Sequence, residues 1–129
     1  MENLIKIYKA KFINMKIQEV QIRLKKFTKD RNWEQYHNPK NLTMALSVEV
    51  AELVEIFQWS NSGGLDEIKN EEIKEKIREE VADIFIYLLN ICERLDLDIP
   101  TIINDKIDKN EIKYPVSKSY GSSKKYTDL

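Results

Sequence analysis

The chain has 129 residues, of which 33% are charged and 42% hydrophobic, and its formal net charge at pH 7 is −1. This length fits one domain, and the near-neutral charge excludes the global field by which proteins attract a nucleic-acid polymer or a membrane surface. The one cysteine, Cys92, excludes an intrachain disulfide and favours a reducing compartment, so we expect a cytoplasmic protein.

Amphipathic periodicity predicts the first helix over residues 15–33. Its apolar positions recur every three or four residues, which places them on one face of a helix. Residues 1–14 show weaker periodicity and are treated as an N-terminal extension, with Met15 as an alternative native start. The apolar face of the helix consists of Ile17, Val20, Leu24 and Phe27.

Proline and glycine residues mark the ends of the second helix. Pro39 disfavours helical backbone in the residue before it, so we expect a loop there. Asn41 or Thr43 can then cap a helix that runs to the region of Trp59. Residues 60–64, with the sequence SNSGG, are expected to end it.

Two further helices and a tail follow. The third helix is predicted over residues 70–94, and its longest apolar run, residues 84–89, is too short to cross a bilayer. The fourth helix is predicted over residues 101–110, with Pro100 in its first turn. Residues 116–129 are rich in Ser and Lys, and we expect them to form a tail that is extended or partly disordered.

These elements predict an all-α fold of the four-helix-bundle type without strands. The helical domain is expected to span residues 15–115, between the extension at 1–14 and the tail at 116–129. Because a monomer of this size buries a limited core, we expect the chain to associate into an oligomer.

Two acidic pairs with three-residue spacing indicate a site. Glu49 and Glu52 lie in the second predicted helix, and Glu80 and Asp83 lie in the third. Residues three apart share one side of a helix, and both pairs adjoin strongly apolar positions. One such pair alone is typical of a solvated face, but four carboxylates brought together repel one another unless a cation neutralises them. The pattern therefore predicts a divalent metal site.

The types of residue that are absent restrict the metal. The only histidine, His37, falls in a predicted loop and not on a helix, so imidazole and thiolate sites lack support. Carboxylate oxygens suit a hard cation, Mg²⁺ or alternatively Mn²⁺. Mg²⁺ in proteins usually keeps positions open for water and substrate phosphates, which suggests metal-assisted hydrolysis of a phosphate ester or anhydride.

Several segments carry a resemblance to a known family. The second and third predicted helices resemble those of the MazG-like nucleotide pyrophosphohydrolases, and most closely of the dCTP pyrophosphatase branch. The matching segments are EVAEL and FQW, followed by EEVADIFIYLL. The segments FTKDRNWEQYHNPKNL, DLDIP, KIDKN, KYPV and GSSKKYTDL resemble the same branch, so that the resemblance covers residues 17–129. One departure is Leu24, which stands where some animal members have a histidine.

The resemblance implies an activity and a role for each matching residue. The implied reaction converts dCTP and water to dCMP and diphosphate, in a homodimer or homotetramer. Glu52 is favoured as the general base, although the sequence does not distinguish it from Glu49. The implied Mg²⁺ ligands are Glu49, Glu52, Glu80 and Asp83; Trp33, Trp59 and Tyr87 would line the base pocket; and Lys106, Asn110 and Lys113 would approach the phosphates.

Other interpretations of the same residues remain open. The tryptophans and Tyr87 are also typical of core or interface packing, and the lysines of a solvated face. A related enzyme acting on another or a modified deoxynucleotide would carry the same metal site. A helical module that binds partners through apolar faces, without enzymatic activity, would need no metal at all.

Overall fold

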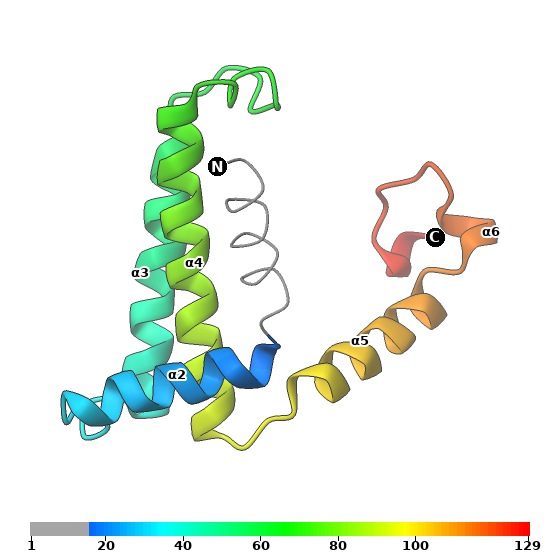
Figure 1. Cartoon of the computed structure of the whole chain (residues 1–129). Helices are drawn as coiled ribbons and strands as arrows, with labels where there is room; N and C mark the ends of the chain where they lie inside the picture. Colours follow the sequence, from blue (N-terminus) through cyan, green and yellow to red (C-terminus); the bar gives the residue numbers. More distant parts are fainter. Residues whose placement is uncertain (1–15) are drawn as a thin grey trace, which may run out of the picture. The chain divides into compact units, whose positions relative to one another are not determined.

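The computed structural model describes residues 16–129, and every regular element in that range is helical (Figure 1). This confirms the predicted all-α class, while the expected extension at residues 1–14 lies outside the described residues. The chain divides after Leu95 into two compact units, so the boundary predicted after residue 115 falls within the second unit. Within residues 16–129, no helix is both long and apolar enough to cross a membrane.

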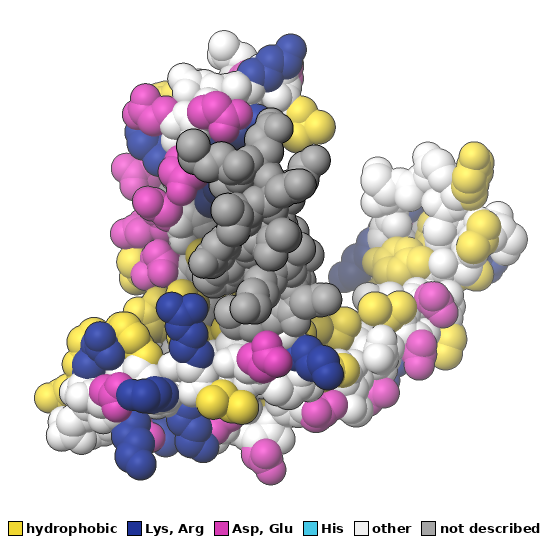
Figure 2. Space-filling view, in the orientation of Figure 1, with side chains coloured by type: hydrophobic (Ala, Val, Ile, Leu, Met, Phe, Trp, Pro, Cys, Tyr) yellow, Lys and Arg dark blue, Asp and Glu magenta, His cyan; other side chains and the backbone are white. Residues whose placement is uncertain are grey.

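The first unit is built on a pair of long helices. These are α3 (Pro39–Phe57) and α4 (Glu71–Arg94), which lie side by side and share the most extensive packing of the described chain (Figure 1). The shorter α2 (Ile17–Asp30) crosses the pair and packs against α4. Figure 2 shows acidic side chains gathered along the α3–α4 pair and Lys and Arg side chains over α2.

Helix α2 ends earlier than periodicity predicts. The prediction extended it to residue 33, but the helix stops at Asp30 and Asn32 has a φ of 53°. Asn tolerates this left-handed conformation better than most residues do, so it can turn the chain out of the helix. Trp33 therefore lies in the loop that connects α2 to α3.

The start of α3 corrects the prediction that Asn41 or Thr43 caps this helix. Asn38 is the capping residue, and its side-chain oxygen accepts a hydrogen bond from the backbone N–H of Asn41 at 2.9 Å. Pro39 occupies the first turn, where a backbone N–H would have no acceptor within the helix, so the lack of this group in proline costs no hydrogen bond. The prediction that Asn38 is not helical is therefore correct, because its backbone is extended. Pro39 itself, however, is the first residue of the helix.

Replacing the capping residue should destabilise the first unit measurably. We expect Asn38→Ala to lower the free energy of unfolding by about 1 kcal/mol, because the Asn41 N–H loses its acceptor. Urea denaturation followed by circular dichroism measures the change. Lys40→Ala, exposed in the same turn, is the control and should stay within about 0.5 kcal/mol of the wild type. An equal loss in both variants would contradict the assignment of the cap.

The second unit contains α5 (Ile99–Lys113), α6 (Val116–Ser119) and the short 3₁₀ helix η1 (Tyr126–Asp128). Asp98 caps α5 by accepting a hydrogen bond from the N–H of Thr101 at 3.1 Å. The expectation of an extended tail is corrected by α6 and η1. Tyr126 packs edge-on against Tyr114, with ring centroids 5.9 Å apart, and thereby joins the end of the chain to the end of α5.

Candidate functional site

Three carboxylates from α3 and α4 meet where the two helices pack together. Glu49, Glu52 and Glu80 each offer one oxygen atom, and these atoms lie within 4.8 Å of one another. Glu49 and Glu52 share one side of α3 because they are three residues apart, and the packing of α4 against α3 brings Glu80 to the same place. We call these three residues the acidic cluster.

One oxygen of the acidic cluster is both buried and unsatisfied. Oε2 of Glu80 has no hydrogen-bond partner among residues 16–129. A buried carboxylate oxygen without a donor is costly, and a positive charge is what relieves that cost. Three carboxylate oxygens at this separation match the ligand set of a hard divalent cation, so the acidic cluster could hold such an ion.

Asp83 stands beside the acidic cluster and not within it. It lies one turn beyond Glu80 on α4, and it lines a cavity together with Glu49. Its negative charge acts on Glu49, whose pKa is raised by burial first, then by Asp83 and Glu52. The structure thus gathers three of the four predicted ligands and places the fourth next to them.

Glu49 and Glu80 of the acidic cluster favour protonation when no cation is present. Burial raises the pKa of Glu80 above its ordinary value, and the negative charge of Glu52 raises it further. The raised pKa of Glu49 has the same two kinds of cause. A divalent cation would reverse this effect, because it stabilises the charged form of each carboxylate.

A cavity of about 520 Å³ adjoins the acidic cluster. It is bounded by α2, by the loop that follows α2 and by α4, with Glu49 contributed from α3. Its walls are mainly apolar, and its carboxylates are Glu49 and Asp83. A volume of this size is typical of a small-molecule site, and an apolar wall with a few polar groups is typical of its lining. The apolar wall consists of Val20, Leu24, Phe27, Trp33 and Ile86.

Aromatic rings shape this cavity. Trp33 packs edge-on against Phe27 with ring centroids 5.8 Å apart, which fixes the indole at the cavity wall. Tyr87 lies one turn beyond Asp83 on α4, and its pKa is raised by burial and by the charges of Glu49 and Asp83. The Tyr87 hydroxyl therefore stays protonated beside the carboxylates and can donate a hydrogen bond.

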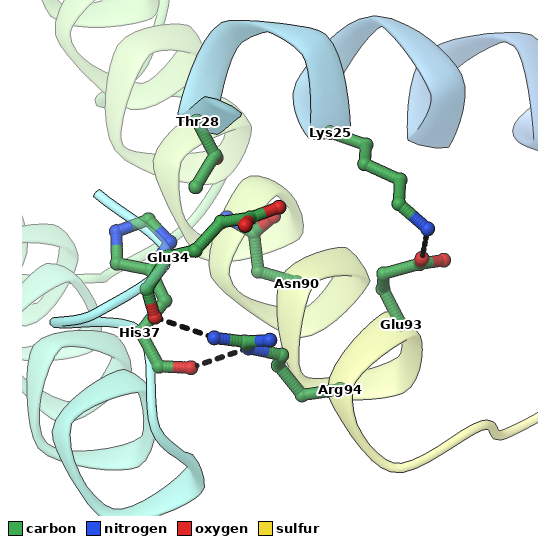
Figure 3. Close-up of a pocket in the computed structure, with 7 residues that line it drawn as sticks. All are labelled: Lys25, Thr28, Glu34, His37, Asn90, Glu93 and Arg94. Atoms are coloured by element: carbon green, nitrogen blue, oxygen red, sulfur yellow. Dashed lines mark hydrogen bonds and ion pairs between the residues drawn. The ribbon is translucent and has the colours of Figure 1, made fainter. Parts of the chain in front are cut away.

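A second, smaller cavity of about 240 Å³ lies at the C-terminal end of α4 (Figure 3). Arg94 donates hydrogen bonds from its guanidinium to the backbone carbonyls of His37 and Glu34, the former at 2.8 Å. Lys25 pairs with Glu93 at 2.7 Å and so ties α2 to α4. These contacts hold the loop that carries Trp33 and His37 against the end of α4.

A sequence model of the MazG-like family matches residues 44–129, which is most of the chain. The chain belongs to the MazG-like family. It is 42% identical to dCTP pyrophosphatase 1 of Rattus norvegicus and 40% identical to that of Homo sapiens, over 105 residues in each case. The aligned residues cover 80% of this chain but only 61% of each relative, so the MazG-like chain spans about three fifths of the length of these relatives.

A solved structure supports the same fold. The crystal structure of a pyrophosphatase from Archaeoglobus fulgidus superimposes with a TM-score of 0.71 at 42% sequence identity. The match covers 76% of the MazG-like chain and 91% of the other protein. The resemblance to the MazG-like family is therefore confirmed both by sequence and by fold.

The structure places the other predicted site residues of this MazG-like chain unequally. Trp33 and Tyr87 line the larger cavity together, whereas Trp59, next to the end of α3, is 86% exposed and does not line it. Contact of Trp59 with a base stays a prediction. The predicted phosphate contacts lie on α5 in the second unit and are exposed, and their role also stays a prediction: Lys106, Asn110 and Lys113.

Sequence reasoning missed four polar residues of the larger cavity, one of which is Arg23 on α2. The other three are Thr28, His37 and Asn90, and burial lowers the pKa of His37, with a further contribution from the positive charge of Arg94. Asn90 follows Asp83 by seven residues and so shares its face of α4, a spacing that could have identified it from the sequence. Thr28 follows Leu24 by four residues and so shares the predicted apolar face of α2, but this spacing does not show that α2 crosses α4 there.

Proposed function

We propose that the protein is a magnesium-dependent nucleoside triphosphate pyrophosphohydrolase that converts dCTP and water to dCMP and diphosphate. The observation that carries this proposal is the acidic cluster, with its unsatisfied buried oxygen, beside an aromatic-walled cavity of about 520 Å³. The names of the relatives, dCTP pyrophosphatase 1 in mammals and a pyrophosphatase in Archaeoglobus fulgidus, support the reaction class.

The acidic cluster explains why the proposal requires a cation. A triphosphate carries about four negative charges, so the carboxylates alone would repel it. Mg²⁺, or Mn²⁺ in its place, fits an all-oxygen ligand set and leaves positions for phosphate oxygens. When bound, the ion would supply charge neutralisation at the phosphates and lower the pKa of water beside them.

The side chains of the chain have distinct tasks in this reaction. Glu49, Glu52 and Glu80 would hold the ion, and Asp83 would complete the set from α4. We assign to Glu52 the acceptance of a proton from the attacking water, with Glu49 as the alternative. The oxygen of that water forms a bond to the α-phosphorus, and the bond from this phosphorus to the leaving diphosphate breaks.

The substrate's other groups are assigned to the remaining residues. We assign the base to the cavity wall that Trp33 and Tyr87 line, because an aromatic face can stack on a base and contribute about 1–3 kcal/mol. We assign the leaving diphosphate to Lys106, Asn110 and Lys113 on the strength of the family resemblance, since lysines neutralise phosphate as point charges. Trp59 is assigned to the rim of the base pocket on the same basis.

We propose that the protein assembles as a homodimer or homotetramer. Among residues 16–129, Leu42 is the one fully buried hydrophobic side chain. On α3 and α4, Val48 is 54% exposed, Val54 60% and Phe85 59%. Such apolar exposure on helices that form the centre of a unit is typical of surfaces that a second subunit covers.

Light scattering tests the assembly directly. At micromolar concentration we expect the mass of a dimer or tetramer, and Phe85→Glu should shift the distribution toward monomer because it places a charge in the apolar surface. Glu79→Gln, an exposed site on the same helix, is the control and should leave the mass unchanged. A monodisperse wild-type monomer would count against the proposal.

A hydrolysis panel tests the activity. The protein is incubated with each deoxynucleoside triphosphate, with and without Mg²⁺, and the products are separated as diphosphate or orthophosphate. We expect diphosphate only, with the highest kcat/KM for dCTP. A preference for another or a modified deoxynucleotide would support a related pyrophosphohydrolase, and the absence of hydrolysis together with the absence of Mg²⁺ binding would favour the non-enzymatic module.

A further inference from the structure

Three polar side chains form a group that the reaction itself does not use. Thr28, His37 and Asn90 are the residues that line both the larger and the smaller cavity, so they stand where the two adjoin. We call them the polar end. Elsewhere in the larger cavity, most lining residues are apolar. Glu49 and Asp83 lie at or beside the acidic cluster, and the remaining polar lining residues are Arg23 and Tyr87.

Two members of the polar end have unused hydrogen-bonding capacity. Thr28 is only 7% exposed, and its hydroxyl makes no hydrogen bond to another described residue. The carboxamide of Asn90 is half-buried and likewise has no partner within residues 16–129. Figure 3 shows both side chains at the smaller cavity. Both groups line the two cavities, where a ligand that brings hydrogen-bonding groups of its own can bind them.

The separation between Asp83, which lies beside the acidic cluster, and Asn90 suits a nucleotide. Asn90 follows Asp83 by seven residues on α4, which at the helical rise of 1.5 Å corresponds to about 10 Å along the axis. Tyr87 lies between them on the same face. A nucleotide spans such a distance: its α-phosphate would lie at the carboxylates and the polar edge of its base at Asn90.

We propose that Asn90, with Thr28 beside it, is a base-recognition residue that hydrogen-bonds the Watson–Crick edge of the substrate's base. This inference rests on the proposed function and extends it to the base. The carboxamide offers an adjacent acceptor and donor, and cytosine offers the complement: its 4-amino group donates to Oδ1 and its N3 accepts from Nδ2. Because a carboxamide turned by half a revolution matches uracil equally, Asn90 anchors a pyrimidine and does not by itself exclude uracil.

The test compares dCTP with the triphosphate of 2-pyrimidinone deoxyriboside, which differs from dCTP only in lacking the 4-amino group. Wild-type enzyme should hydrolyse the analogue with a kcat/KM about 10-fold below that of dCTP, since Oδ1 of Asn90 is left without a donor. Asn90→Leu, which keeps the size of the side chain, should lower kcat/KM for dCTP by about 10–100-fold, chiefly through a raised KM. The same variant should bring the ratio between the two substrates close to one, a result that a merely structural role would not produce.

Controls separate the possible failures. Gln58→Leu, an exposed amide outside the cavity, should retain the wild-type ratio. Equal treatment of the two substrates by the wild type, or an unchanged ratio in Asn90→Leu, would overturn the role of Asn90 and leave the hydrolase intact. Wild-type enzyme that hydrolyses no nucleotide would overturn the proposed function, and the inference with it. The wild-type comparison decides the matter even if the variant fails to fold.

Discussion

Replacing Glu52 or Asp83 by alanine is expected to abolish diphosphate release from dCTP, with a loss of more than about 100-fold in kcat. In the proposed mechanism each carboxylate helps to hold the cation that neutralises the phosphates. Glu52 is one of three residues whose oxygens lie within 4.8 Å of one another, and Asp83 stands beside Glu49 in the adjoining cavity. A steady-state assay of released diphosphate measures the effect.

The control for both variants is Glu79→Ala. Glu79 is an exposed acidic residue next to Glu80 in the sequence, and it belongs to neither the acidic cluster nor the larger cavity. We expect it to keep wild-type turnover, because a solvated carboxylate does not hold the ion. The helical circular dichroism of all three variants should remain native. Unchanged turnover in Glu52→Ala or Asp83→Ala would remove the proposed site.

Replacing Glu80 by glutamine is expected to have opposite effects on stability with and without magnesium. The pKa of Glu80 is raised in the folded chain by burial and by the charge of Glu52, so the folded state binds more protons than the unfolded state does. The stability of the metal-free protein should therefore fall as pH rises from the ordinary carboxyl pKa through the raised one. At neutral pH, Glu80→Gln removes this repulsion, and the Tm of the metal-free variant should exceed that of the wild type.

Magnesium is expected to reverse the order of the Tm values of the wild type and Glu80→Gln. At a concentration one hundred times its Kd, Mg²⁺ should raise the Tm of the wild type by about 10 °C. Glu80→Gln should lose most of this shift, because the amide keeps the shape of the ligand without its charge. Differential scanning calorimetry in EDTA and in Mg²⁺ gives all four values, and Glu79→Gln is the matched control. A variant that is destabilised without metal and still responds to Mg²⁺ would contradict the account.

Local signals in the sequence were sufficient for most of the fold. Apolar periodicity predicted the third helix over residues 70–94, and α4 spans Glu71–Arg94, because Asn70 caps it through the N–H of Glu72. The same approach placed the start of α3 too late, since Pro39 both disfavours helix before it and suits the first turn. The two short helical segments after residue 115 carry no periodicity over so few residues.

The sequence predicts those parts of the candidate site in which two residues lie close together because of their spacing on one helix. Glu49 and Glu52 must share a side of α3, and charge repulsion explains why a second acidic pair on α4 indicates a cation. Spacing within α4 could not reveal that Asp83 would lie beside the cluster formed by the other three. It also could not bring Thr28 to the polar end, because that contact depends on how α2 crosses α4.

The small core and the acidic cluster have a common physical explanation. Glu49 and Glu80, which are half-buried where α3 packs against α4, occupy space that apolar side chains would otherwise fill, and they destabilise the metal-free pair through burial and repulsion. In the proposed assembly, a bound cation and a second subunit would compensate for these losses. Binding of metal and folding stability are then linked, which is why calorimetry can report on the site.

Diffraction from crystals grown with Mn²⁺ tests the central claim most directly, because anomalous scattering locates the ion without reference to activity. The account predicts a peak between α3 and α4, within about 2.0–2.4 Å of carboxylate oxygens from Glu49, Glu52 and Glu80. A protein that shows no peak there under saturating Mn²⁺, with the three carboxylates turned away from one another, would contradict it.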